Sequence, residues 1–337
     1  MNVQNRLRPG TRNDLSDALP LAQPYVLLVD PSSLCNLRCK WCPSGHEHII
    51  AETKRAQQIM PFELFETLVR QAAAFGAPFR VLRLYKEGEP LVNPRFEDMV
   101  RLAKQSGCFS RIDTTTNGLL LNPERNRRII QAGIDQINLS VNGVSAEQMY
   151  RHTGRRVDFQ DYVRNIQDLC EHRGNCTIYI KSIQDVLTEP EQEKFFQLFG
   201  ELADRVYLER LSPAWPDFDV SLSGYRFEDI GNYGQPLENR KVCPYLFYIM
   251  VVNADGTVST CVGDWKHHQV VGDIRSSSLK EIWQGEPQRH YQLTHLRGEK
   301  DRLELCRVCQ VITHGCYDNI DAAAEEIAEQ LIQRAYR

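Results

Sequence analysis

The chain has 337 residues, of which 42% are hydrophobic, so it is long enough to bury one large core or two moderate ones. Its formal net charge is −4 and it has no long basic run, which argues against nucleic acid as the main partner. No apolar stretch could cross a membrane, Met1–Gly10 lacks the apolar core of a signal peptide, and eleven cysteines fit a reducing cytoplasm in which thiols bind metals.

In chain order, residues 1–24 form a polar extension, and an alternation of strands and helices follows. The expected strands are Tyr25–Asp30, Phe79–Tyr85, Ser110–Thr115, Gln136–Val141, Thr177–Ile183 and Arg205–Arg210. The expected helices between them are Phe62–Ala74, Pro94–Gln105, Glu124–Ala132, Phe159–His172 and Pro190–Leu202. Prolines at or near helix starts and glycines after helix ends (Gly76, Gly107 and Gly133) support these boundaries. Six such units predict a parallel sheet with right-handed crossovers, short of a closed eight-fold barrel.

Three cysteines follow the first expected strand. Cys35, Cys39 and Cys42 have the spacing C-x3-C-x2-C, and three thiolates in one loop can hold three irons of a [4Fe–4S] cube. The fourth iron would be left open for chemistry, as in catalytic metal sites. The alternative is a zinc knuckle completed by His46 or His48.

Polar residues stand where the later strands end. Lys86-Glu87-Gly88-Glu89-Pro90 follows the second strand, Thr116-Asn117-Gly118 the third, Ser140 closes the fourth, and Lys181 lies near the end of the fifth. Strand ends of this kind carry active sites in α/β barrels. The plain alternatives are ordinary turns and, for Lys181, a surface lysine.

A second cysteine set follows a Pro-, Asp-, Gly- and Tyr-rich bridge, residues 212–242. It comprises Cys243, Cys261, Cys306, Cys309 and Cys316. Ile249–Asn253 and Thr257–Cys261 form an expected β-hairpin around Asp255-Gly256. A structural zinc on the same sulfurs is the alternative to an iron–sulfur cluster. Cys108, Cys170 and Cys176 are interpreted as packing thiols.

The first cysteine motif, with Trp41 before its third cysteine, resembles the radical S-adenosylmethionine (radical SAM) superfamily. The resemblance implies a partial (β/α)6 TIM-like barrel, a [4Fe–4S] cluster that binds SAM at its open iron, and a 5′-deoxyadenosyl radical that removes hydrogen from the substrate. It also implies a flavodoxin- or ferredoxin-type reductant.

The same resemblance suggests SAM contacts. Glu89 matches the carboxylate that binds the amino group of SAM, Gly88 permits close backbone approach, and Thr116 and Asn117 match the element that passes the ribose. Ser140 and Lys181 are candidates for the SAM carboxylate, and Trp41 for an aromatic neighbour of the cofactor. Two positions depart from the family pattern: Glu87 replaces a glycine and Asn142 replaces an aspartate.

The later cysteines resemble the SPASM/twitch group of this superfamily. Five cysteines instead of seven imply the twitch form, with one auxiliary [4Fe–4S] cluster held by Cys243, Cys261, Cys306 and Cys309. The expected organisation is an extension (1–24), the barrel (25–211), the bridge (212–242), a small β-hairpin-plus-helix iron–sulfur domain (243–320) and a C-terminal helix (321–337).

The function that these resemblances imply is hydrogen abstraction from a carbinol carbon of a sugar or aminocyclitol. The products would arise by oxidation, with the auxiliary cluster accepting an electron, or by epimerisation, with Cys316 as hydrogen donor. Candidate contacts to this small carbohydrate-like substrate are Glu209, Arg210, Trp215, Asp264 and Trp265. The alternatives are a radical SAM peptide maturase and, from another class, a two-cluster electron carrier.

Overall fold

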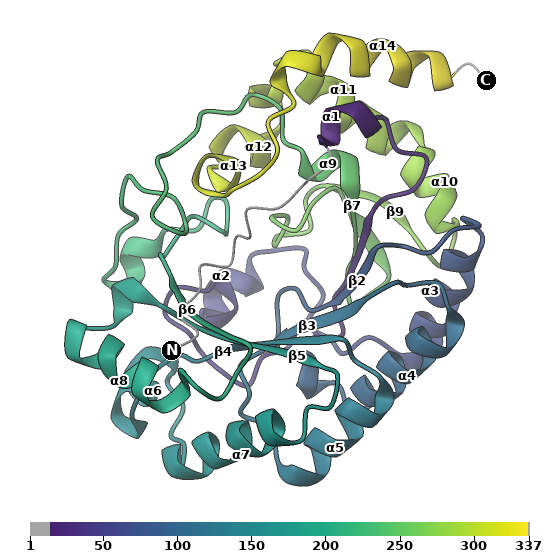
Figure 1. Cartoon of the computed structure of the whole chain (residues 1–337). Helices are drawn as coiled ribbons and strands as arrows, with labels where there is room; N and C mark the ends of the chain where they lie inside the picture. The colour runs from purple at the N-terminus through teal and green to yellow at the C-terminus, as the bar shows by residue number, and fades with distance from the viewer. Residues whose placement is uncertain (1–13, 336–337) are drawn as a thin grey trace.

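A single twisted sheet of nine strands organises the described part of the chain. The computed structural model describes residues 14–335, and its strands run in the spatial order β6-β5-β4-β3-β2-β1-β7-β8-β9 (Figure 1). The strands are β1 Val26–Val29, β2 Val81–Leu84, β3 Ile112–Thr116, β4 Gln136–Ser140, β5 Thr177–Ile183, β6 Arg205–Glu209, β7 Ile249–Val252, β8 Thr257–Ser259 and β9 Val270–Asp273. Strands β1 to β6 are parallel neighbours in chain order, which confirms the predicted partial barrel.

Helices cover the outer face of this sheet and the C-terminal region (Figure 1). The first group is α1 Leu15–Ala18, α2 Glu47–Ala51, α3 Phe62–Ala73, α4 Phe96–Ser106, α5 Pro123–Ala132, α6 Ala146–Thr153, α7 Phe159–Glu171 and α8 Glu189–Phe199. The second group is α9 Tyr245–Tyr248, α10 Leu279–Gln284, α11 Glu286–Leu296, α12 Glu304–Val308, α13 Val311–His314 and α14 Ala324–Ala335. None of the described helices has the length and apolar character needed to cross a membrane.

Local sequence signals explain where the barrel helices begin and end. Asn122 accepts a hydrogen bond from the Arg125 N–H at the start of α5, and Pro123 occupies the first helical position. Gly107 and Gly133 end α4 and α5 in the left-handed conformation, as predicted for C-terminal caps. The helix α6 was not predicted, although Ser145 caps it through the Gln148 N–H.

The strand β7 joins the barrel sheet directly. It pairs in parallel with β1 over four residues and antiparallel with β8, so the predicted hairpin exists but extends the barrel sheet. Val26 and Leu28 of β1 pack with Ile249 and Val251 of β7 in one buried cluster. The two regions therefore share a continuous ladder of backbone hydrogen bonds.

The C-terminal helix packs on its own chain. It was predicted from residue 321, and α14 begins at Ala324 after a short 3-10 turn. It contacts α11, and Ile327 lies in a cluster with Leu15, Leu19 and Leu296. Residues 1–13 and 336–337, which include part of the predicted extension and helix, lie outside the described residues.

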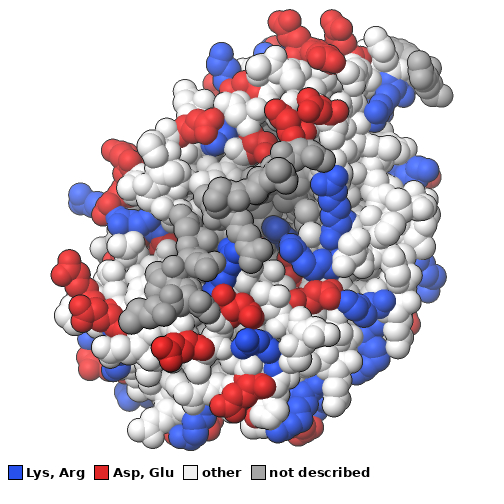
Figure 2. Space-filling model, viewed as in Figure 1, with Lys and Arg blue, Asp and Glu red and all other residues white. Residues whose placement is uncertain are grey.

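Alternation along the strands gives the barrel a polar interior. In β5 the side chains of Ile178 and Ile180 are buried among the apolar residues that pack against the helices, whereas Tyr179 lines a cavity inside the barrel. That cavity, here called the lumen, has a volume of about 1040 Å³. Its wall includes Arg83, Asp113, Asn138, Tyr233, Tyr245, Tyr248, Cys316 and Tyr317. On the molecular face in Figure 2, acidic and basic side chains are interspersed.

Candidate functional site

The cysteine loop after β1 is held against the Gly88 segment after β2. A Cβ atom on Gly88 would lie 2.2 Å from the Ser32 carbonyl oxygen and 2.4 Å from that of Leu34. The Glu89 N–H donates to the Leu34 carbonyl at 2.9 Å. Only glycine permits this approach, so Gly88 brings the two backbone segments together.

Glu89 is buried at the end of β2 and accepts hydrogen bonds from its own chain. Its Oε1 accepts from the Leu91 N–H at 3.0 Å and from the Thr116 hydroxyl at 2.6 Å, and its Oε2 accepts from the Asn117 N–H at 2.8 Å. Burial raises the pKa of Glu89, and these hydrogen bonds oppose the rise. A carboxylate has about four acceptor positions. One position on Oε2 therefore remains for an ammonium group, as the predicted SAM contact requires.

Thr116 and Asn117 orient the residues around them. The Thr116 hydroxyl donates to Glu89 and so orients that carboxylate, and its predicted contact with the SAM ribose stays a prediction. Asn117 donates from Nδ2 to the Asn36 side chain at 2.7 Å, which links β3 to the cysteine loop. The Tyr162 hydroxyl donates to the Asn117 carbonyl at 2.9 Å. Asn36 and Tyr162 were not predicted as site residues, because no recognisable motif marks them.

Ser140 and Lys181 are partners in the register of β4 and β5, so the two side chains predicted to meet the SAM carboxylate lie on neighbouring strands. Lys181 forms an ion pair with Glu209 of β6, and both side chains are mostly buried. Glu209 therefore orients the Lys181 ammonium group. The alternative, that Lys181 is an ordinary surface lysine, is not supported, because its side chain is mostly buried.

Trp41 fills the space between the cysteine loop and α6. It is 9% exposed, and its ring meets those of His152 at 5.4 Å and Tyr225 at 6.0 Å in edge-to-face geometry. The His152 Nδ1 lies 2.8 Å from the carbonyl of Asn142, the residue that departs from the family pattern. The predicted cofactor contact of Trp41 stays a prediction.

The first cysteine set has the chemistry expected of an iron–sulfur site. Burial raises the pKa of Cys35 to about 12, and the neighbouring charge of Cys42 adds to the rise. Burial, followed by the charges of Cys42 and Cys35, also raises the pKa of Cys39. The three thiols are therefore mutual neighbours that must lose protons when they bind iron. Within residues 14–335 no three Cys, His, Asp or Glu side chains lie close enough to share one metal ion, so the fit rests on this donor chemistry.

The second cysteine set surrounds a small cavity. Cys243, Cys261, Cys306 and Cys309 all line a space of about 30 Å³, with Leu305, Val311 and Ile312 among its apolar walls. Four converging thiols in an apolar pocket fit a fully ligated iron–sulfur cluster. Cys316 is not part of this wall and instead lines the lumen.

Removing one thiol of the second set should remove one cluster. For the Cys261→Ser variant we expect about four irons per chain after anaerobic reconstitution, against about eight for the unmodified protein, because each cube holds four. A Cys176→Ser control should keep about eight, since that buried thiol packs in the core. Equal iron content in the Cys261 variant and the unmodified protein would contradict the assignment.

Several predicted substrate contacts have other roles in the structure. Asp264 is fully buried and accepts from Ser259 and from the His268 and Gln269 N–H groups. Trp265 is also fully buried and donates to the Pro216 carbonyl. These two predictions were wrong, because the loop uses both side chains to hold its own shape. Arg210 pairs with Asp185 and Glu228, and Trp215 packs half-buried against the core.

Asp30, directly after β1, is expected to make the stability of the fold depend on pH. Burial, together with repulsion from Glu87, raises its pKa to about 7, against the opposing charges of Lys86 and Arg55. The folded state therefore holds this proton more tightly than the unfolded chain, whose pKa is about 3.9, and loses stability as pH rises from about 4 to about 7. Asp30→Asn should have a higher thermal midpoint than the unmodified protein at pH 8, and the difference should shrink toward pH 5.

Asp98→Asn is the control for that pH dependence. Asp98 is hydrogen-bonded to Arg95, which lowers its pKa, so its variant should show a constant difference between pH 5 and 8. Parallel melting curves for Asp30→Asn and the unmodified protein across this range would refute the expectation.

Fold and donor sets together define a class: a partial barrel with an open iron–sulfur site at its strand ends and a second cysteine site beside it. The radical SAM superfamily matches residues 29–183, and the SPASM iron–sulfur cluster-binding domain matches residues 243–310. A relative from Pyrococcus furiosus, the tungsten-containing aldehyde ferredoxin oxidoreductase cofactor-modifying protein, is 30% identical over 77% of this chain and 81% of its own length. The chain belongs to the radical SAM superfamily and carries a SPASM domain, so its cofactors are SAM and iron–sulfur clusters.

Other relatives share parts of the chain or only its fold. The GTP 3′,8-cyclase of Chlorobaculum tepidum is 31% identical over 42% of this chain and 39% of its own length; the chain spans 35–39% of the first three cyclases that it matches. The structure of BtrN in complex with AdoMet and 2-DOIA matches with a TM-score of 0.55 and 19% identity, over 87% of this chain and 97% of that one. Streptococcus suis SuiB bound to precursor peptide SuiA matches with a TM-score of 0.63 and 14% identity, over 91% and 74%.

Proposed function

We propose that this radical SAM enzyme removes hydrogen from a carbinol carbon of a sugar or aminocyclitol and releases a ketone. The observation that carries the proposal is the lumen, a polar cavity of about 1040 Å³ lined by hydroxyl, amide and guanidinium groups. Asn138 and Tyr179 on its wall lie two residues before Ser140 and Lys181, the candidate contacts of SAM. Val26, Val81 and Gln136, the first residues of β1, β2 and β4, also line the lumen, so the cavity extends from about 7 Å below those contacts toward the opposite end of the sheet.

The chain's own groups suit a hydroxylated substrate. Asn138 and the lumen tyrosines can donate to and accept from hydroxyl groups, and Asp113 is a carboxylate on the same wall. When bound, the clusters would supply the electron that cleaves SAM and accept the electron that leaves the substrate. The carbinol thereby loses one hydrogen atom to the deoxyadenosyl group, one proton and one electron, which balances its conversion to a ketone.

Cys316 favours epimerisation as the second outcome at the same site. Its place on the lumen wall would let a thiol return hydrogen to a substrate carbon. Loss of the epimerised product in Cys316→Ser, with SAM cleavage retained, would assign it the donor role. Unchanged formation of the epimerised product in that variant would show that Cys316 is not the hydrogen donor.

A peptide substrate is the other candidate, because SuiB, solved with a precursor peptide, shares the fold over most of this chain. GTP is a further substrate to test, because proteins similar to part of this chain are named GTP 3′,8-cyclases. The proposal includes a cytoplasmic location, where thiols stay reduced, and a flavodoxin- or ferredoxin-type reductant.

The test is anaerobic. Reconstituted protein, dithionite and SAM are incubated with aminocyclitols, sugars, GTP or precursor peptides, and 5′-deoxyadenosine and product are quantified by mass spectrometry. A polyol that gains a carbonyl, with one 5′-deoxyadenosine per product, supports the dehydrogenase. Turnover of GTP or a peptide with all polyols inert would replace it, and the absence of any SAM cleavage would reject radical chemistry.

A further inference from the structure

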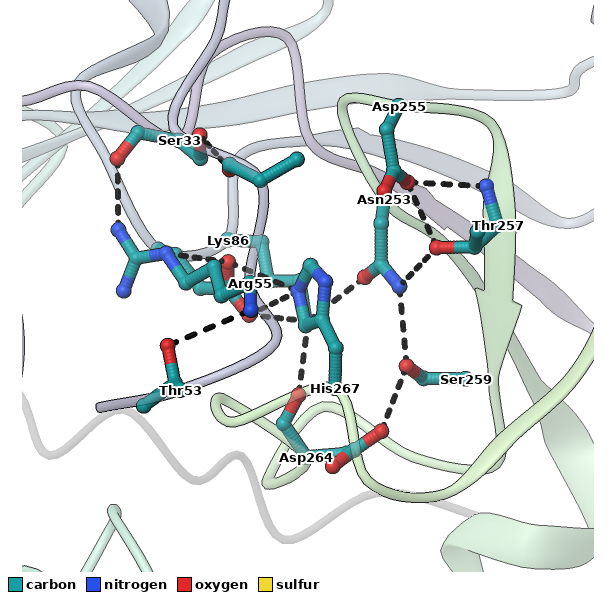
Figure 3. Close-up of polar contacts among 12 residues, drawn as sticks. Ser33, Thr53, Arg55, Lys86, Asn253, Asp255, Thr257, Ser259, Asp264 and His267 are labelled. Carbon is teal, nitrogen blue, oxygen red and sulfur yellow. Dashed lines mark hydrogen bonds and ion pairs between the residues drawn. The ribbon is translucent and has the colours of Figure 1, made fainter. Parts of the chain in front are cut away.

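A buried charged network lies just beyond the ends of β2 and β7 and includes Glu87, next in sequence to the Gly88-Glu89 segment. Figure 3 shows Arg55, Lys86 and His267 with their polar contacts. The members of the network are Arg55, Lys86, Glu87 and His267, whose side chains are 1%, 0%, 0% and 4% exposed. Burying charged side chains costs free energy unless they are paired, so a buried network of four such residues suggests a specific structural role. Neither cysteine motif includes any of these residues.

Glu87 is the hub of the network. Its Oε2 lies 3.0 Å from the Arg55 Nε, its Oε1 lies 3.0 Å from the His267 Nε2, and Lys86 forms an ion pair with Oε1. Burial alone would raise the pKa of Glu87, but Lys86, the His267 hydrogen bond and Arg55 lower it to about 2. The carboxylate is therefore charged and pairs with its sequence neighbour Lys86 and with Arg55 and His267, which come from two other segments. A residue without a side chain at this position could hold none of them.

One arm of the network reaches the cysteine loop. Arg55 donates to the Ser33 carbonyl at 2.6 Å and to the Ser44 hydroxyl at 3.1 Å. The Ser44 hydroxyl donates in turn to the Glu87 carbonyl at 2.7 Å. Ser33 precedes the three cysteines in sequence and Ser44 follows them, so the network is hydrogen-bonded to both ends of the cysteine loop.

The other arm reaches the auxiliary-cluster domain. Lys86 donates to the Asn253 side chain at 2.8 Å and to the Asp264 carbonyl at 3.2 Å. Asn253 donates to Ser259, which donates to the Asp264 carboxylate at 2.8 Å (Figure 3). Asp264 belongs to the loop that follows Cys261, and its N–H donates to the Cys261 carbonyl at 3.3 Å. A chain of polar contacts thus runs from one cysteine set toward the other.

The backbone of His267 has an unfavourable conformation, and in this conformation the side chain contacts Glu87. Its φ is +56°, in the left-handed region, which is uncommon for residues other than glycine. Such a conformation is energetically unfavourable and persists where the surrounding structure enforces it. Its neighbour His268 is exposed and makes no such contact with Glu87. The strain therefore coincides with the ring that meets Glu87.

We propose that Glu87 and His267 are positioning residues through which the auxiliary-cluster domain fixes the cysteine loop and, through the adjoining Gly88-Glu89 segment, the site of SAM. Glu87 precedes Gly88, which presses on the backbone of the cysteine loop, and Glu89, the candidate ligand of the SAM amino group. Displacing Glu87 would move both. The inference rests on membership of the radical SAM superfamily and not on the proposed substrate.

The test compares three histidine variants of the reconstituted full chain. His267→Asn tolerates the left-handed backbone but is too short to reach Glu87, His267→Gln can still donate to it, and His268→Asn is the matched control. The readouts are iron content, the electron paramagnetic resonance (EPR) spectrum of the reduced SAM-site cluster with and without SAM, and that cluster's midpoint potential. None of these requires the substrate.

We expect His267→Asn to keep its iron, to lose most of the SAM-induced change in the EPR spectrum and to shift the midpoint potential. His267→Gln should restore both properties in large part, and His268→Asn should behave as the unmodified protein. A Glu87→Gln variant, where it folds, should resemble His267→Asn. The proposal is overturned if His267→Asn only melts at a lower temperature with unchanged spectrum and potential, or if His267→Gln is as impaired as His267→Asn.

Discussion

Replacing Gly88 with alanine is expected to abolish the SAM-site cluster. The added Cβ would lie 2.2 Å and 2.4 Å from two carbonyl oxygens of the cysteine loop, and both are backbone atoms that no rotamer change can move away. Overpacking of well-packed regions costs about 1–3 kcal/mol and more where the backbone must shift. The loop would move away from β2, and Glu89 would lose its hydrogen bond to Leu34.

The measurement for Gly88→Ala is iron content with SAM cleavage under dithionite. We expect about four irons per chain, those of the auxiliary site, and no 5′-deoxyadenosine. The control is Gly76→Ala, where a Cβ meets nothing within 4 Å but the φ of +81° still penalises alanine. It should cost about 1–2 kcal/mol of stability and leave both clusters intact. If Gly88→Ala keeps both clusters and cleaves SAM normally, the cysteine loop can move enough to accommodate the added Cβ, and the expectation is wrong.

The second large effect is expected for Glu89→Gln. The amide matches the size of the carboxylate but has one acceptor oxygen, so it cannot serve the Thr116 hydroxyl, two backbone N–H groups and a cationic ligand together. Losing a hydrogen bond to a charged group costs about 1.5–3 kcal/mol. The affinity for SAM should therefore fall about 10- to 100-fold.

Equilibrium dialysis of SAM against the reconstituted protein measures this loss. Glu124→Gln removes an exposed carboxylate from α5 and should leave the affinity unchanged. Iron content must stay normal in both variants, which separates a binding defect from a failed cluster. If Glu89→Gln binds SAM as tightly as the unmodified protein, Glu89 does not bind SAM and only accepts hydrogen bonds from Leu91, Thr116 and Asn117.

The barrel could be predicted because its signals are local. The six strands are short segments with apolar or β-branched residues that alternate with helical patterns, and the prediction of Thr177–Ile183 matched β5 at both ends. The cysteine spacings are likewise local, and spacing within one loop determines which thiols can converge. Glu89 was identified by its place after a strand and a glycine.

Long-range pairings could not be predicted from local patterns. Nothing in Ile249–Val252 distinguishes a free hairpin strand from one that pairs with β1, because both are apolar on both faces. Asp264 and Trp265 resembled exposed loop residues, and only the fold shows that they are buried. His267 meets Glu87 across 180 positions in the sequence, a contact that periodicity does not encode.

The pairing of β1 with β7 also sets an order for folding. Residues 26–29 emerge first from the ribosome, yet one of their two partner strands, residues 249–252, is made more than two hundred residues later. At a synthesis rate of about 5–20 residues per second, the edge of β1 that pairs with β7 stays unpaired for at least ten seconds. Unpaired strand edges promote aggregation. A chain cut before β7 should therefore collect in inclusion bodies, and cellular chaperones have a defined segment to protect until synthesis passes Val252.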